Sequence, residues 1–124
     1  QLIKKYTKKN IKIDFTPHLS PMFRGILSTI YLDINKKKKY SKIIETLEKF
    51  YKKDPFIKIF KNGKLLSTND VINTNNCLIS INKSRNNNKI IILSVIDNLI
   101  KGGAGQAVQN LNLKFGFPIK TGLI

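Results

Sequence analysis

The stretch that decides the fold is SVIDNLIKGGAGQAVQN, residues 94–110. An almost unbroken apolar run from Ile90 to Ile96 leads into it, and the polar pair Asp97 and Asn98 separates that run from a glycine cluster that opens a helical pattern. This order predicts a buried strand followed by the start of a helix. A helix start presents free backbone N–H groups, and glycines let a ligand or a second backbone approach closely. The stretch is therefore the candidate functional edge, with close strand–helix packing through glycine as the alternative.

Known nucleotide-binding motifs are incomplete or absent in this stretch. Gly103 and Gly105 could begin the pattern G-x-G-x-x-G/A, but Val108 stands at its third place and no acidic residue follows about 20 positions on, because the chain ends at Ile124. The phosphate-binding pattern G-x-x-x-x-G-K-[ST] does not occur. The sequence therefore does not predict a complete nucleotide-binding unit.

Length and composition favour one domain over residues 1–124. The chain starts at Gln1 without an initiator Met, has no apolar run long enough to span a bilayer, and is typical of a piece of a soluble protein. The single cysteine, Cys77, permits no internal disulfide framework and no multi-cysteine zinc site. We expect a cytoplasmic protein with no metal centre and no membrane partner.

The net charge of +16 raises the alternative of a basic nucleic-acid-binding module. Only Arg24 and Arg85 are arginines, however, and the lysines are scattered or lie at loop ends. A basic stripe interleaved with aromatic residues is lacking. The joint abundance of Lys, Asn and Ile favours a general compositional bias, so we expect no nucleic-acid partner.

The first half of the chain predicts two strands around a helix. Residues 1–10 resemble the end of a helix, and alternation over 11–15 predicts a short half-buried strand. A loop over 16–25, stiffened by two prolines, then leads to a strand over 25–34 with both faces partly covered. A charged turn over 35–39, a helix over 41–53 and a strand over 56–60 would complete a right-handed crossover unit.

The second half predicts a hairpin and a final helix. A polar loop over 67–76 with a small anchor at Val71 and Ile72 leads to a strand over 77–81, which pairs antiparallel with the strand over 89–96. The helix after the glycines ends at Gly116. Its apolar stripe is expected to pack inward and its amides to point elsewhere. The stripe is Ala104, Ala107, Val108, Leu111 and Phe115, and the amides are Gln106, Gln109 and Asn110. The predicted fold class is α+β, with a mixed, largely antiparallel sheet of four or five strands and helices packed on it.

Two long segments together resemble a known enzyme family. They are FTPHLSPMFRGILSTIY, residues 15–31, and SVIDNLIKGGAGQAVQNLNL, residues 94–113. In this order they resemble the C-terminal part of N-acetyl-gamma-glutamyl-phosphate reductases, and the ending over 115–123 resembles the C-terminus of that family. The resemblance covers nearly the whole chain.

The resemblance implies a two-part enzyme. Family members have an N-terminal dinucleotide-binding domain and a catalytic and dimerisation domain that resembles those of aspartate-semialdehyde and glyceraldehyde-3-phosphate dehydrogenases. This chain would be most of the second domain, in a homodimer or homotetramer, with the missing first domain as its partner. A dimerisation domain without catalysis is the alternative. The implied reaction, in arginine biosynthesis, reduces the acyl phosphate to N-acetylglutamate 5-semialdehyde with NADPH. A cysteine thiolate displaces phosphate, and the thioester accepts hydride.

The family's catalytic residues fall outside this chain. Its nucleophilic cysteine and its catalytic histidine both align before Gln1, so no catalytic residue is assigned here and the fragment alone should be inactive. Cys77 aligns with a position other than the nucleophile and is interpreted as a buried structural thiol. The family often has aspartate where this chain has Leu78, and alanine where it has Gly103.

Six residues are candidates for ligand contacts. Arg24 has the fork geometry that suits a carboxylate or phosphate of the substrate, with a salt bridge as the alternative. His18, on the same loop, is the second substrate candidate, with a role in loop structure as the alternative. The resemblance places Asn98, Lys101, Gly102 and Gly103 near the nicotinamide end of NADP, and Asn98 could instead cap the helix. These assignments require two segments to lie side by side. They are the loop over 16–25, called the arginine loop below, and the segment over 99–105, called the glycine turn.

Overall fold

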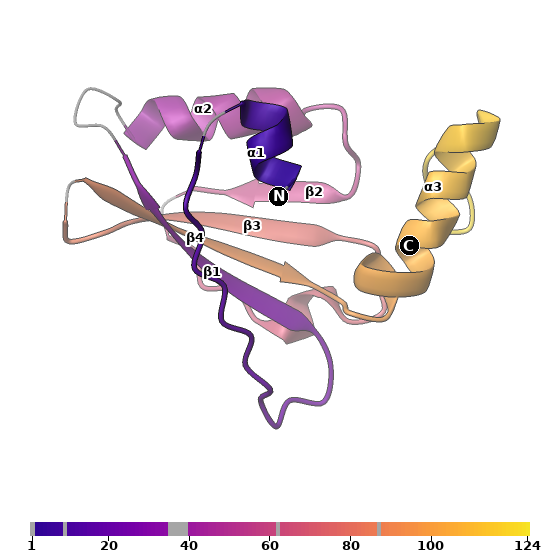
Figure 1. The fold of residues 1–124 in the computed structure, drawn as a ribbon. Coiled ribbons are helices and arrows are strands. Elements are labelled where there is room, and N and C mark those ends of the chain that lie inside the picture. Colours follow the sequence, from indigo (N-terminus) through magenta and orange to yellow (C-terminus); the bar gives the residue numbers. More distant parts are fainter. Residues whose placement is uncertain (1, 9, 35–39, 62, 87) are drawn as a thin grey trace.

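A mixed four-stranded sheet lies at the centre of the fold in the computed structural model, which describes residues 2–8, 10–34, 40–61, 63–86 and 88–124 (Figure 1). The strand order is β1 (Ile26–Asp33), β4 (Lys89–Ile96), β3 (Cys77–Lys83), β2 (Ile57–Phe60). The β1–β4 and β3–β4 pairs are antiparallel, and the β2–β3 pair is parallel. The predicted fold class and the β3–β4 hairpin are confirmed.

Strand β4 is central because its apolar run has two neighbours. Ile96 pairs with Ile26 of β1 on one side and with Cys77 of β3 on the other, and this register continues along both ladders. Ile90 and Val95, near the two ends of β4, are buried. The mainly apolar sequence of β4 is thus consistent with its central place in the sheet.

Helix α2 (Tyr40–Tyr51) lies along the β2 edge of the sheet (Figure 1). It buries Ile44, and the Tyr40 hydroxyl donates to the carbonyl of Ile81 in β3. As a crossover requires, β1 and β2 run in the same direction; β4 and β3 lie between them. The charged turn predicted over 35–39 lies outside the described residues.

A small core lies on the face of the sheet that the 67–76 loop covers. The loop contains the short helix η1 (Thr68–Val71), which Ser67 and Asp70 cap reciprocally. Val71, the predicted anchor of this loop, is completely buried. The core cluster consists of Leu66, Val71, Leu78 and Val95, and Phe60 and Leu93 pack against it.

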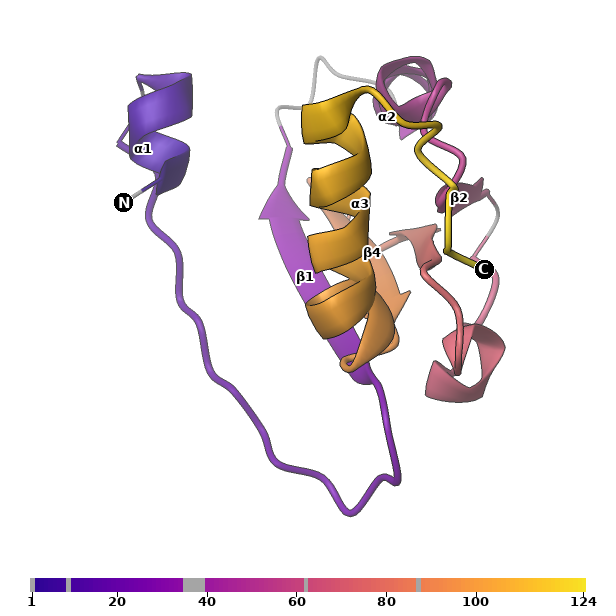
Figure 2. The same cartoon turned by 90° about the vertical axis from the view of Figure 1, so that its right-hand side faces the viewer.

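The prediction of a strand over 11–15 is wrong. Residues 10–23 form neither strand nor helix, and the apolar side chains of Ile13, Phe15 and Leu19 are exposed. The segment leads from helix α1 (Leu2–Thr7) to β1, and the two views together place α1 away from the sheet (Figures 1 and 2). A strand needs a neighbour for its N–H and C=O groups, and alternation alone does not supply one.

The orientation predicted for the last helix is also wrong. Helix α3 (Gly105–Phe115) follows the wide turn η2 (Ile100–Ala104) and ends, as predicted, at a left-handed Gly116. Its buried residues are Gly105, Gln109 and Asn112. The predicted apolar stripe instead faces outward, with Leu111 and Phe115 exposed. Strand β1 departs from expectation in the same way, because side chains on both of its faces are largely exposed.

The chain exposes far more surface than its mass requires. Its accessible area is 9912 Å² for 14.2 kDa. A compact monomer of this mass exposes about 6,800 Å². The excess matches the open faces of β1, α3 and residues 10–23.

Candidate functional site

Three segments distant in sequence meet at Asp97, the residue that follows β4. Arg24, at the end of the arginine loop, faces Asp97 with one edge of its guanidinium. Nε of Arg24 donates to Oδ1 of Asp97 at 3.0 Å, and Nη2 lies 2.9 Å from Oδ2. Asp97 is fully buried, and the Arg24 side chain is 16% exposed. The pair is therefore a two-point buried ion pair, the strong geometry for arginine and carboxylate.

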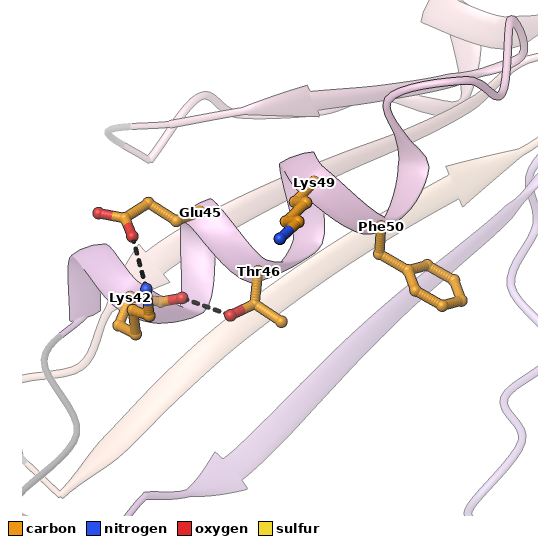
Figure 3. Close-up of a pocket in the computed structure, with 5 residues that line it drawn as sticks. All are labelled: Lys42, Glu45, Thr46, Lys49 and Phe50. Atoms are coloured by element: carbon orange, nitrogen blue, oxygen red, sulfur yellow. Dashed lines mark hydrogen bonds and ion pairs between the residues drawn. The ribbon is translucent and has the colours of Figure 1, made fainter.

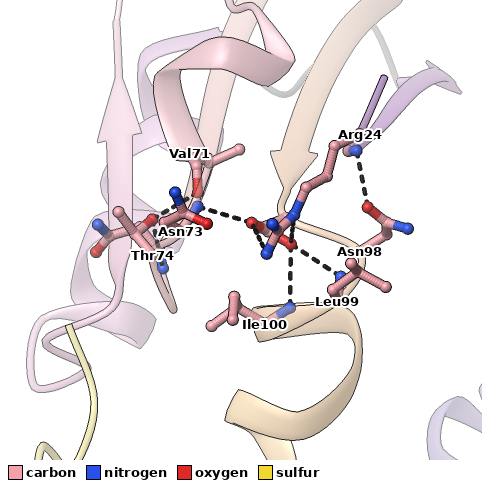
Figure 4. Close-up of polar contacts among 10 residues, drawn as sticks. Arg24, Val71, Asn73, Thr74, Asn98, Leu99 and Ile100 are labelled. Carbon is pink, nitrogen blue, oxygen red and sulfur yellow. Dashed lines mark hydrogen bonds and ion pairs between the residues drawn. The ribbon is translucent and has the colours of Figure 1, made fainter. Parts of the chain in front are cut away.

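Three backbone N–H groups complete the shell of the Asp97 carboxylate. Leu99 and Ile100 donate to Oδ1 at 2.8 and 3.0 Å, and Asn73 donates to Oδ2 at 2.8 Å (Figure 4). We call Asp97 and its donors Arg24, Asn73, Leu99 and Ile100 the Asp97 cluster. The cluster joins the arginine loop, the 67–76 loop and the start of the glycine turn.

The cluster lowers the pKa of Asp97 from 3.8 to about 2. Burial by itself raises this pKa, because it disfavours the charged carboxylate. The hydrogen bond from Arg24 and the N–H groups of Ile100, Asn73 and Leu99 outweigh it. Asp97 is thus ionised at neutral pH.

The arginine loop and the glycine turn lie side by side, as the sequence analysis required. Beside the Arg24–Asp97 pair, the Gly25 N–H donates to Oδ1 of Asn98 at 2.8 Å. Gly25 has φ of 110°, and a Cβ there would lie 2.6 Å from Cβ of Thr68. Glycine is therefore needed at this crossing. Asn98 does not cap the helix; Asp97, which accepts from Leu99 and Ile100, takes that place.

The glycine turn combines close packing with an open outer surface. A Cβ on Gly105 would lie 2.5 Å from Asn75 Oδ1 and 2.8 Å from the carbonyl oxygen of Ile100, so close backbone packing accounts for this glycine. Gly102 and Gly103 are exposed. The Gly102 N–H donates to the carbonyl of Asp97 at 2.9 Å, and Gly103 has the non-helical angles φ −147° and ψ −114°. The turn presents backbone without side chains to the outside.

Lys101 lies at this turn with a tether that the sequence did not reveal. Its ammonium donates to Oε1 of Gln109 at 2.7 Å and lies 5.5 Å from the centre of the Phe56 ring. Oε1 of Gln109 also accepts from Nδ2 of Asn75 at 2.9 Å. Both amides are almost completely buried.

His18 does not join this arrangement. Its Nδ1 lies 3.1 Å from the carbonyl oxygen of Thr16, and the residue is exposed on the 10–23 segment. Cys77 is half-buried rather than buried, with its sulfur 3.5 Å from the Ser94 hydroxyl. Among the described residues, no three His, Cys, Asp or Glu side chains group as metal ligands.

A shallow hollow lies elsewhere, on the outer face of α2 (Figure 3). Two of its contacts are internal to the helix: Lys42 Nζ lies 3.2 Å from Glu45, and the Thr46 hydroxyl donates to the Lys42 carbonyl at 2.7 Å. It shares no residue with the Asp97 cluster. We therefore place the candidate site at the cluster and the adjoining glycine turn.

Comparison with known proteins places this chain in a family. The family model described as semialdehyde dehydrogenase, dimerisation domain, matches residues 1–98. N-acetyl-gamma-glutamyl-phosphate reductases of Clostridium kluyveri and Clostridium novyi are 47% and 45% identical to the chain over 94% and 99% of its length. By the first of these matches, the chain belongs to the family of semialdehyde dehydrogenase dimerisation domains. It spans about a third of these relatives, 34% and 35% of their lengths.

A solved structure supports the fold. Aspartate semialdehyde dehydrogenase II of Vibrio cholerae superposes with a TM-score of 0.53 and 20% identity, over 76% of this chain and 28% of that one. The predicted likeness to the C-terminal domain of such dehydrogenases is therefore confirmed. None of the helices in the described ranges is both long enough and apolar enough to cross a bilayer.

Proposed function

We propose that this chain is the C-terminal domain of an N-acetyl-gamma-glutamyl-phosphate reductase, an oxidoreductase of arginine biosynthesis in the cytoplasm. The observation that carries the proposal is the 47% identity to such a reductase over 94% of the chain. The contact between the arginine loop and the glycine turn supports the proposal, since both segments then line one edge of the site, which we call the rim.

The chemistry divides between two domains in this proposal. A preceding domain supplies the thiolate and the histidine, and NADP in its reduced form supplies the hydride that reduces the thioester. This chain supplies one wall of the site. The exposed Gly102 and Gly103 suit the approach of a flat ring, because a Cβ on Gly103 would meet only the Asn98 carbonyl oxygen, at 3.4 Å. Asn98 and Lys101 flank that surface, which fits one end of a dinucleotide.

Arg24 is the proposed substrate cation. Asp97 occupies its Nε and Nη2 edge, and within the described residues its Nη1 has no hydrogen bond. That nitrogen can donate to a carboxylate or phosphate of the acyl phosphate while Asp97 fixes the plane of the guanidinium. His18 lies on the same loop and is the second proposed contact, made when the preceding domain covers residues 10–23.

The exposed apolar surfaces fit the proposed partners. The preceding dinucleotide-binding domain would cover α3 and residues 10–23, and a second copy would cover the open sheet. Each surface is apolar, as stable subunit and domain interfaces are at their centres. A homodimer or homotetramer results.

A chimaera tests the proposal. Residues 1–124 would replace the matching third of the Clostridium kluyveri reductase, and the gene would be expressed in a bacterium that lacks its own N-acetyl-gamma-glutamyl-phosphate reductase. We expect growth without arginine. A matched chimaera in which the donor's nucleophilic cysteine is replaced by serine should not grow. Failure of the first chimaera, when it accumulates as soluble protein, would contradict the proposal.

A further inference from the structure

A chain of three side chains ends at the Lys101 ammonium. Lys101 Nζ lies 2.7 Å from Oε1 of Gln109, and the same oxygen lies 2.9 Å from Nδ2 of Asn75. Gln109 is 5% exposed and Asn75 is completely buried. The ammonium therefore rests on two amides inside the fold.

The lysine dictates how both amides point. An ammonium can only donate, so Gln109 must turn its oxygen toward Lys101, and Asn75 must then offer its NH₂ group to that oxygen. Oδ1 of Asn75 is left without a partner in the described structure. A buried acceptor without a donor is destabilising, because it loses the hydrogen bonds that water would give it. The arrangement gives up stability to hold one cation.

The held cation has no carboxylate partner among the described residues. Its contacts are the Gln109 oxygen and the face of the buried Phe56 ring, 5.5 Å away. Lys101 itself is half-buried, next to the exposed Gly102 and Gly103. Its charge therefore remains available to an anion at the rim.

We propose that Gln109 and Asn75 are positioning residues that hold the Lys101 ammonium against a phosphate of a bound ligand. The inference rests on the proposed function, in which two ligands carry phosphate: the acyl-phosphate substrate and NADPH. A lysine ammonium binds phosphate as a point charge, and its effect depends on where it is held.

Steady-state kinetics of the chimaera test the role. Gln109→Met removes the acceptor, and we expect KM to rise about tenfold for the ligand whose phosphate meets Lys101, with kcat within about twofold. A rise in the KM of acyl phosphate or in that of NADPH tells which ligand it is. Gln109→Glu keeps an oxygen toward Lys101 but gives the ammonium a carboxylate partner, so it should also raise this KM.

Two further variants separate positioning from folding. Gln106→Met is the matched control, because Gln106 bonds to exposed Asn110 on the same helix and has no other side-chain hydrogen bond within the described residues. It should leave KM unchanged. Lys101→Met combined with Gln109→Met should raise KM no further than Lys101→Met alone. A parental KM in Gln109→Met or in Gln109→Glu would overturn the proposal.

Acetylation with acetic anhydride tests the tether without activity. Mass spectrometry would follow the labelling of Lys101 in η2 against that of Lys114 in α3. We expect Gln109→Met to raise the Lys101 to Lys114 labelling ratio about threefold, because a released ammonium reacts more freely. An unchanged ratio would overturn the proposal. An inactive parental chimaera would contradict the proposed function, and this ratio would still decide the positioning role.

Discussion

Asp97 shows at the residue scale how one buried charge connects three segments. It receives two contacts from Arg24 and three from backbone N–H groups, so the carboxylate is satisfied without water. Removing one partner of such a pair costs about 3–5 kcal/mol, chiefly because the other charge stays buried and unpaired. The cluster therefore fixes the rim as a unit.

Replacement of Asp97 should change how the free energy of unfolding depends on pH. The pKa of Asp97 is about 2 in the folded chain and 3.8 unfolded, so its ionisation adds stability that is present above pH 4 and lost as pH falls through about 2. The shift corresponds to about 2 kcal/mol. In Asp97→Asn this contribution is absent. Urea unfolding at pH 6 and pH 2.5 should show that the free energies of unfolding of Asp97→Asn and wild type differ less at the lower pH. A constant difference would argue against the stabilising role of the ionised Asp97 cluster.

The two kinds of glycine in the turn should respond differently to alanine. Gly105→Ala places a methyl group 2.5 Å from Asn75 Oδ1 and 2.8 Å from a backbone oxygen, so we expect a loss of about 1–3 kcal/mol. Gly102→Ala is the control, since its nearest neighbours lie at 3.4 Å and beyond. Thermal unfolding should separate the two variants, and equal melting temperatures would refute the packing role of Gly105.

Sequence reasoning predicted part of the site at this scale. The meeting of Arg24 with the glycine turn was predicted, because both segments belong to one family resemblance. Asp97 was missed as the central residue, although an Asp between a strand and a helix is a recognisable capping signal. The Lys101–Gln109 contact could not be predicted, since the irregular turn at Gly103 breaks the helical spacing between them.

Helix α3 shows at the element scale what an amphipathic pattern leaves open. The period of apolar residues predicted the helix and its end at Gly116, but three polar or small residues face inward and the stripe faces outward. Periodicity identifies an apolar face without naming its partner. That partner is outside this chain in our proposal, so the direction of the helix could not be inferred from this chain alone.

Leu111→Ser should separate the two roles of α3. Leu111 is about half exposed, so unfolding of the isolated chain should change by less than about 0.5 kcal/mol. In the chimaera, where the preceding domain would cover this face, the same change should lower the melting temperature by several degrees, about 1–3 kcal/mol in stability. Lys114→Ser on the same helix is the control. Equal effects of Leu111→Ser in both proteins would argue that α3 has no such partner.

The accessible surface area of the whole chain is larger than that of a compact monomer of the same mass. The chain exposes roughly 3,000 Å² more than a compact monomer of its mass, and many large apolar side chains of β1, α3 and residues 10–23 are exposed. Large exposed apolar patches mark interaction surfaces. The β3–β4 hairpin could be predicted because a short polar connection joins two mainly apolar strands. The strand over 11–15 was predicted wrongly because alternation does not show which neighbour would pair with it.

The isolated chain should therefore associate with itself. Light scattering coupled to size exclusion at about 10 μM should give a dimer or larger species, since an interface of this kind buries about 1,200–2,000 Å². Moderate salt should not dissociate this oligomer, because the surface that would form its interface is apolar. A folded monomer at this concentration would contradict the open sheet as a subunit interface.

The most direct test of the account is the acyl-phosphate-dependent rate of NADPH oxidation by the purified chimaera. We predict a kcat within about tenfold of the parental Clostridium kluyveri reductase, because the transplanted domain carries its own rim residues. A folded, oligomeric chimaera whose rate does not exceed that of the cysteine-to-serine control would contradict the assignment of this chain as the C-terminal domain of such a reductase.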